Sequence, residues 1–173
     1  MNDLMFNEVP VVEGKQFYKF GDWKLYAIHD ENNIKGFFGD FKWLSNFHPC
    51  PVFYERLLYP SSENAYQAAK LDTDYRQHLQ QCTPEKSKRE WKKHPLLDVS
   101  PEDWDSRKYD VMSVILFDKF YRNKPLRQKL IETGDKFLEE KNHWSDVFWG
   151  VDIKKGGENN LGKILMKLRT YWK

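Results

Sequence analysis

A run near the middle of the chain, residues 60–70 (PSSENAYQAAK), places a carboxylate, an amine and an aromatic ring at helical spacing. Pro60 and the serines after it predict a helix start, because a serine N-cap accepts a hydrogen bond from a free backbone N–H of the first turn. Glu63 falls in that turn, where the helix dipole favours a carboxylate. Lys70 follows two turns later and is expected on nearly the same face, with Tyr66 and Gln67 between them. The pattern predicts a catalytic strip; an ordinary amphipathic helix with solvated charges is the alternative.

The bulk composition limits the class of protein. The length of 173 residues fits one domain with a good-sized core. The net charge of +2 does not by itself mark a nucleic-acid binder, and the 16% aromatic content suits either a core or base stacking. The cysteines Cys50 and Cys82 suggest no disulfide framework, and the scattered histidines predict no zinc site. No signal peptide or membrane-spanning run is apparent, so we expect a cytoplasmic protein without metal or cofactor.

The first part of the chain reads as an extension. Strand-like runs at 16–20 and 23–28 flank Gly21-Asp22, which suits a tight turn, so residues 1–33 are predicted to hold a β-hairpin. Residues 34–173 are expected to form the main domain, opening with a strand over 34–39.

The remaining pattern predicts a mainly helical α+β domain with a few short strands. Two strands are expected at 52–54 and 57–59 around a Glu55-Arg56 turn, and another at 137–140. Strong start signals, with a capping hydroxyl before proline, stand at Thr83-Pro84 and Ser100-Pro101. Helices are expected at 74–81, from 84, at 101–122, at 126–133, and after the glycine-rich run 156–162.

Two further stretches carry charge or backbone groups that can bind phosphate. Residues 86–93 hold many cations and can contact nucleic acid or steer a phosphate-bearing substrate; a solvated helix face is the alternative. The run from Gly156 to Gly162 leads into a helix whose free N–H groups can bind phosphate, although it matches neither a Walker A loop nor a dinucleotide fingerprint. The cations of the first stretch are Lys86, Lys88, Arg89, Lys92 and Lys93.

Several segments, taken in order, resemble the NADAR (YbiA-like) family of N-glycosidases over about four-fifths of the chain. The matching residues are Leu44-Ser45-Asn46-Phe47, Ser62-Glu63, Tyr66-Gln67-Ala68, Lys70, Trp104, Val111-Met112, Lys119-Phe120, Thr133-Gly134, Glu140, Asp146, Trp149-Gly150, Asn160-Leu161-Gly162, Leu165-Met166 and Arg169. The chain departs from the family pattern at Asn64, where histidine is usual, and at Asp152 and Glu158.

The resemblance implies hydrolysis of a C–N bond between ribose and a base. Such a reaction develops positive charge on the ribose, and a fixed carboxylate beside that carbon stabilises the charge and can activate water. Glu63 is the first choice for this carboxylate and Asp146 the second, while Lys70 is expected to hold a phosphate or polarise the leaving group. Each also has a structural alternative; Asp146, for example, suits a turn.

The resemblance also implies a substrate-binding set. Trp104 and Trp149 are expected to stack on the base or shield the cation, unless they belong to the core. The other members of the set are Ser45, Asn46, Phe47, Tyr66, Gly150, Asn160 and Gly162.

Two substrate classes follow from the resemblance. One is ADP-ribosylated guanine, in DNA or in nucleotides, and the other is the phosphoribosylamino-pyrimidine intermediates of riboflavin synthesis. A non-catalytic protein that binds ADP-ribose or nucleic acid is the alternative of another class.

Overall fold

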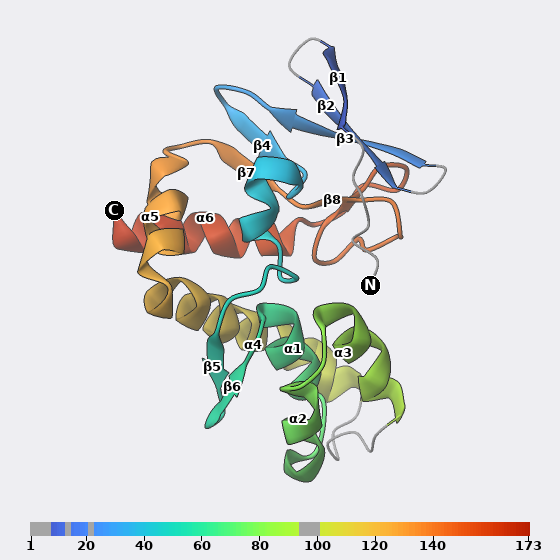
Figure 1. Cartoon of the computed structure of the whole chain (residues 1–173), viewed down its shortest axis with the longest axis vertical. Coiled ribbons are helices and arrows are strands. Elements are labelled where there is room, and N and C mark those ends of the chain that lie inside the picture. Colours follow the sequence, from blue (N-terminus) through green and yellow to red (C-terminus); the bar gives the residue numbers. More distant parts are fainter. Residues whose placement is uncertain (1–7, 13–14, 21–22, 94–100) are drawn as a thin grey trace. The chain divides into compact units, whose positions relative to one another are not determined.

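The computed structural model describes residues 8–12, 15–20, 23–93 and 101–173 (Figure 1). The chain divides into two compact units. We call Met1–Ser45 with Leu130–Lys173 the sheet unit, and Asn46–Lys129 the helical unit. Each is described by itself.

The sheet unit holds a five-stranded sheet of order β1-β2-β3-β4-β7. Neighbouring strands from β1 to β4 run antiparallel, whereas β4 and β7 are parallel. The strands are β1 (Glu8–Val12), β2 (Lys15–Phe20), β3 (Trp23–His29), β4 (Asn33–Lys35) and β7 (Phe137–Glu139).

The two strands predicted near the N-terminus are present as β2 and β3, paired in register from Lys15↔Ile28 to Phe20↔Trp23. The turn predicted at Gly21-Asp22 lies outside the described residues. The strand predicted over 34–39 is wrong beyond residue 35, because Gly36 adopts φ +93° and η1 (Gly39–Leu44), a short 3-10 helix, follows.

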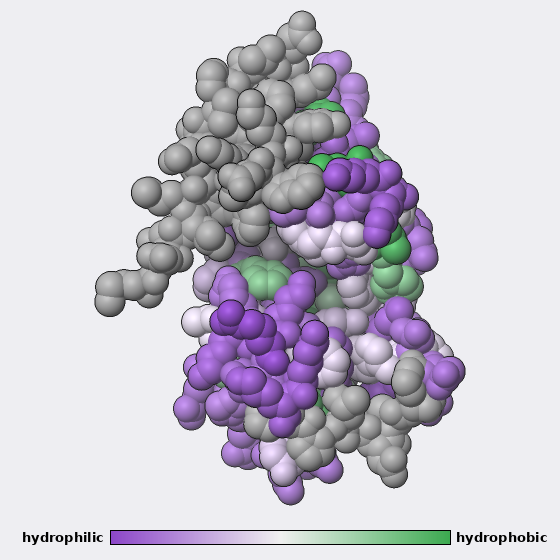
Figure 2. Space-filling view, turned by 90° about the vertical axis from the view of Figure 1, so that its right-hand side faces the viewer, coloured by the Kyte–Doolittle hydropathy of each residue, from purple (hydrophilic) through white to green (hydrophobic). Residues whose placement is uncertain are grey.

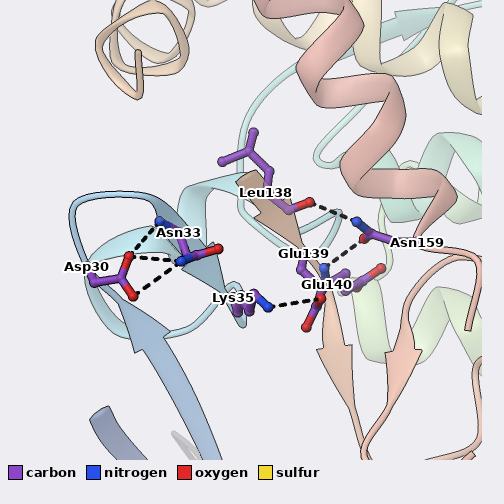
Figure 3. Close-up of polar contacts among 7 residues, drawn as sticks. All are labelled: Asp30, Asn33, Lys35, Leu138, Glu139, Glu140 and Asn159. Atoms are coloured by element: carbon purple, nitrogen blue, oxygen red, sulfur yellow. Dashed lines mark hydrogen bonds and ion pairs between the residues drawn. The ribbon is translucent and has the colours of Figure 1, made fainter. Parts of the chain in front are cut away.

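The last helix, α6 (Asn160–Trp172), is fixed to β7 by the side chain of Asn159 (Figure 3). The Asn159 Nδ2 donates to the Leu138 carbonyl at 2.8 Å, and its Oδ1 accepts from the Glu140 N–H at 3.1 Å. Gly162 lies so close that a Cβ there would stand 2.2 Å from the Leu138 oxygen. Glycine at this position is therefore required for packing. The same unit contains β8 (Lys141–Asn142), paired in parallel with β9 (Val151–Asp152).

The loop before β4 is organised by one carboxylate. Asp30 Oδ1 accepts from the backbone N–H groups of Asn32 and Asn33 at 2.8 and 2.7 Å, and the Asn33 side chain also donates to it, as Figure 3 shows. Residues 30–33 thus form a turn that the Asp30 carboxylate holds.

The helical unit begins with a hairpin and continues in helices. The hairpin turn, Glu55-Arg56, has positive φ at both residues, as a two-residue hairpin loop requires. The elements of the helical unit are β5 (Val52–Tyr54), β6 (Leu57–Tyr59), α1 (Ser62–Ala68), α2 (Thr73–Leu79), α3 (Pro84–Glu90), η2 (Trp91–Lys93), α4 (Pro101–Arg122) and α5 (Lys124–Glu132). The residues of α5 from Leu130 onward are assigned to the sheet unit.

The start and end signals read from the sequence largely hold. Thr83 caps α3 by accepting from the Lys86 N–H at 3.2 Å, and Pro84 follows it in the first turn. Helix α4 ends at Arg122 as predicted, while its predicted cap, Ser100, lies outside the described residues. The predicted mainly helical α+β fold is confirmed. None of the helices in the described ranges is long and apolar enough to cross a membrane.

Replacing Gly162 by alanine is expected to destabilise the protein by about 1–3 kcal/mol, because the added Cβ collides with the Leu138 carbonyl. Urea unfolding of this variant measures the loss. Lys163→Ala, at the next and exposed position of α6, is the control and should change stability by less than about 0.5 kcal/mol. Equal stability of Gly162→Ala and the parent protein would contradict the packing role.

Candidate active site

The site in the helical unit is built on α1, a helix buried on every side. All seven residues of α1 are buried, and the helix packs against α2, α3, α4, β5 and β6. Small residues such as Ala65 and Ala68, both 0% exposed, allow this close packing. Asn64 Nδ2 donates to the carbonyls of Leu79 and Cys82 at 2.9 and 2.8 Å and so ties α1 to the end of α2. The residue at which the chain departs from its family pattern thus acts as a structural cross-link.

The N-terminus of α1 is capped as predicted, and a second segment joins it. Ser61 Oγ accepts from the Asn64 N–H at 3.2 Å. The Glu63 N–H donates to the Asn46 carbonyl at 3.0 Å, and Asn46 Nδ2 lies 3.4 Å from Met112 Sδ of α4. Asn46 therefore lies beside the first turn of α1, where it fixes the backbone of Glu63.

A hydrogen-bonded chain connects the predicted carboxylate to the predicted amine. Glu63 is only 5% exposed, and its Oε1 accepts from Gln67 Nε2 at 2.7 Å. Lys70 Nζ in turn donates to Gln67 Oε1 at 2.7 Å. The alternative of solvated helix charges is therefore wrong for Glu63. Gln67, which the sequence places on the same face, joins the carboxylate to the amine.

Lys70 itself lies beyond the helix, and not on its second turn as predicted. Helix α1 ends at Ala68 with Ala69 as its C-cap. The chain then turns and directs the Lys70 ammonium against aromatic rings. Its Nζ lies 4.4 Å from the ring centroid of Trp91, 4.9 Å from Tyr66 and 5.7 Å from Trp104. We call these rings the aromatic cage.

The cage changes the acidity of the amine. Burial lowers the pKa of Lys70 to about 8, the negative charge of Glu63 opposes this shift, and repulsion from Lys88, Lys92 and Lys108 adds to it. At neutral pH roughly a tenth of Lys70 is then uncharged. An amine with this pKa can serve either as a cation or as a proton carrier.

Unpartnered acceptors stand near the same helix. Among the described residues, Asn46 Oδ1 and Ser62 Oγ are buried and have no hydrogen-bond partner. Buried polar atoms usually find a partner, so such atoms mark places where a ligand or water completes the bonding. Phe47, also predicted to bind substrate, lies 5.4 Å below the Lys88 ammonium.

The predicted residues of the sheet unit gather around one loop. Asp146 Oδ1 accepts from the Trp149 N–H at 2.9 Å, which is the contact of a turn residue. Gly150 has no room for a side chain, since a Cβ would lie 2.5 Å from the Glu140 oxygen. Asn160 Nδ2 donates to Glu158 Oε2 at 2.9 Å. Ser45 lies elsewhere in the same unit, at the end of η1.

Two N–H groups at the start of α6, which the sequence analysis expected to be available to phosphate, already donate to loop carbonyls. The Asn160 N–H donates to the Phe148 carbonyl at 3.3 Å, and the Leu161 N–H donates to the Trp149 carbonyl at 3.0 Å. Loop carbonyls thus occupy the helix start.

The predicted residues therefore form two sets. The helical unit brings together Glu63, Tyr66, Lys70 and Trp104, with Asn46 beside them. Trp91, the ring nearest to Lys70, was missed, since only its place after a basic helix marks it in the sequence. Within the described part of the chain no cluster of three or more His, Cys, Asp or Glu side chains offers a metal site.

Comparison with known proteins identifies the family. The sequence model of the NADAR domain matches residues 30–172. The solution structure of the E. coli protein YbiA has a TM-score of 0.69 and 29% sequence identity, and the match covers 84% of this chain and 88% of YbiA. The chain belongs to the NADAR family, as its motifs predicted.

The similar proteins with curated names are of two kinds. N-glycosidase YbiA of Escherichia coli (strain K12) is 34% identical over 136 residues, which span 76% of this chain and 80% of YbiA. Riboflavin biosynthesis protein VVA0006 of Vibrio vulnificus (strain YJ016) is 35% identical over 135 residues, or 73% of this chain but only 34% of that protein. N-glycosidase Npun_R5314 of Nostoc punctiforme is 42% identical over 67 residues, again less than half of its length.

The low pKa of Lys70 can be measured directly. Labelling with an amine-reactive reagent at several pH values, followed by mass spectrometry, should show a midpoint near 8 for this amine, against about 10.4 for lysine in a model peptide. In Glu63→Gln the midpoint should move lower still, because the attraction that opposes the shift is lost. A midpoint near that of the peptide would contradict the desolvated cage.

Proposed function

We propose that this protein is an N-glycosidase that hydrolyses a ribose–base C–N bond, and that its substrate is ADP-ribosylated guanine, in DNA or as a nucleotide. The observation that carries the proposal is the chain from Glu63 through Gln67 to Lys70, held beneath aromatic rings. Similarity to proteins named N-glycosidase supports it.

The chemistry assigns a task to each group. As the C–N bond breaks, positive charge grows on the ribose carbon and the bonding pair moves to the base nitrogen. The Glu63 carboxylate stabilises that charge and takes a proton from the attacking water, whose oxygen bonds to the carbon. The base nitrogen takes up a proton from solvent, and Glu63 releases its proton to solvent after the reaction. The Lys70 ammonium supplies a hydrogen bond to the departing base or to a substrate phosphate, and Tyr66 and Trp104 provide faces for a flat ring. Asn46 Oδ1, buried without a partner among the described atoms, is suited to a ribose hydroxyl.

A second candidate substrate class shares this chemistry. Phosphoribosylamino-pyrimidine intermediates of riboflavin synthesis also contain a ribose C–N bond, and similarity to a riboflavin biosynthesis protein favours them. Release of product from one substrate class and not from the other decides between the two.

Glu63→Gln is expected to lower kcat by about 10²- to 10⁴-fold while the protein stays folded, because the amide keeps the shape and loses the charge. The measurement is release of ADP-ribose from an ADP-ribosylated guanine nucleotide, with EDTA present. Glu85→Gln, an exposed carboxylate in the first turn of α3, is the matched control and should keep full activity.

Two outcomes would overturn these assignments. Full activity in Glu63→Gln together with its loss in Asp146→Asn would transfer the role to Asp146. Tight binding of ADP-ribose without release of any base, by a folded parent protein, would mean a binding protein.

The pH dependence tests the charge state of Lys70. If the ammonium is the active form, kcat/KM should fall as the pH rises through about 8, since this ratio reports the free enzyme. Lys70→Arg keeps its charge throughout this range and should show no such fall, although its rate is lower. A rise in kcat/KM through pH 8 would instead assign the reaction to the neutral amine.

A further inference from the structure

The helix after α2 presents cations to solvent. Lys86, Lys88 and Arg89 of α3 and Lys92 of η2 are all exposed. Figure 2, turned so that the right-hand side of Figure 1 faces the viewer, shows many hydrophilic residues on the helical unit. With the rings of Phe47 and Trp91, these residues make up what we call the basic–aromatic surface.

The cations of this surface outnumber the carboxylates beside them on α3, Glu85 and Glu90. Glu90 accepts from Lys93 at 2.9 Å, lies 3.9 Å from His78 Nε2 and is also attracted by the charge of Lys86. Among the described residues no ion pair joins Lys86, Lys88, Arg89 or Lys92 to an acid.

Two cations instead lie over half-buried rings. Lys88 Nζ is 5.4 Å from the ring centroid of Phe47, and Lys92 Nζ is 6.0 Å from that of Trp91. Both rings keep part of their surface in solvent. Alternating cations and aromatic faces are the pattern by which proteins hold single-stranded nucleic acid, with phosphates on the cations and bases on the rings.

The surface also adjoins the candidate site. Trp91 belongs both to it and to the aromatic cage, 4.4 Å from Lys70 Nζ. Lys88 and Lys92 are close enough to repel the Lys70 ammonium. The basic–aromatic surface and the aromatic cage therefore share one ring, Trp91.

We infer that the basic–aromatic surface binds a single-stranded nucleic acid and that the substrate is a nucleotide within such a strand. The inference rests on the proposed function for the reaction itself. A duplex is disfavoured, because its bases are stacked on one another and cannot reach Phe47 and Trp91.

The first test measures affinity for an unmodified, fluorescently labelled 12-nucleotide strand by anisotropy between 50 and 200 mM salt. The parent protein should bind with an affinity that falls with salt, and more tightly to the strand than to its duplex. In Lys88→Gln/Lys92→Gln the slope of log K against log salt should become shallower by about 1.4, at about 0.7 for each lost phosphate contact. Lys124→Gln/Lys129→Gln, exposed lysines of α5, is the control and should keep the parent slope.

The second test concerns stacking. Phe47→Leu keeps an apolar side chain and removes the ring, so affinity for the strand should fall about 5-fold or more. Phe53→Leu is a close match, because Phe53 is 44% exposed and lies under a cation, Arg122, at 5.4 Å. It should bind like the parent protein.

The outcomes separate this inference from the reaction. Release of ADP-ribose from a mononucleotide, with no salt-dependent binding of the strand, overturns the inference and leaves the glycosidase proposal intact. Salt-dependent binding that the lysine and Phe47 variants weaken, without release from any substrate, supports the surface and overturns the reaction. Equal binding by Lys88→Gln/Lys92→Gln and the parent protein also overturns the inference.

Discussion

The burial of one ammonium group constrains the whole site. An ammonium loses hydration when rings surround it, and that cost must be met by a hydrogen-bond acceptor, a carboxylate or π faces. Lys70 uses the Gln67 amide and three rings, and Glu63 acts on it through space. A neutral amide, that of Gln67, stands between carboxylate and amine and joins Glu63 to Lys70 through two hydrogen bonds.

The architecture of α1 follows from this constraint. A helix of two turns is marginal alone, so its order comes from packing on every face and from the cross-link made by Asn64. Since the helix ends at Ala68, Lys70 leaves the helical path and reaches Trp91, which belongs to a different element. The close packing of α1 and the end of the helix before Lys70 together place the Lys70 amine against Trp91. A longer α1 would carry residue 70 away from this path.

Local signals in the sequence predicted local features well. The caps at Ser61 and Thr83, the turn at Glu55-Arg56 and the end of α4 depend on neighbouring residues alone, and they are confirmed. Contacts between distant segments left no such signal. Trp91 over Lys70 joins residues 21 positions apart, and Asn46 beside Glu63 joins 17, so neither follows from periodicity. The sequence-based prediction made strand β4 too long, because the turn at Gly36 is set by packing rather than by composition.

The two places where the sequence suggested phosphate binding differ in physical kind. Backbone N–H groups at a helix start suit one small anion in a fixed geometry, but in α6 the carbonyls of Phe148 and Trp149 already accept two of them. The glycines of that run are instead needed where helix and strand approach closely, as at Gly162. Flexible lysines over rings impose no single geometry and tolerate successive phosphates along a polymer. We therefore expect the lysine and arginine side chains of α3 to bind phosphate. Because these side chains are flexible, they favour the successive phosphates of a strand over an isolated phosphate group.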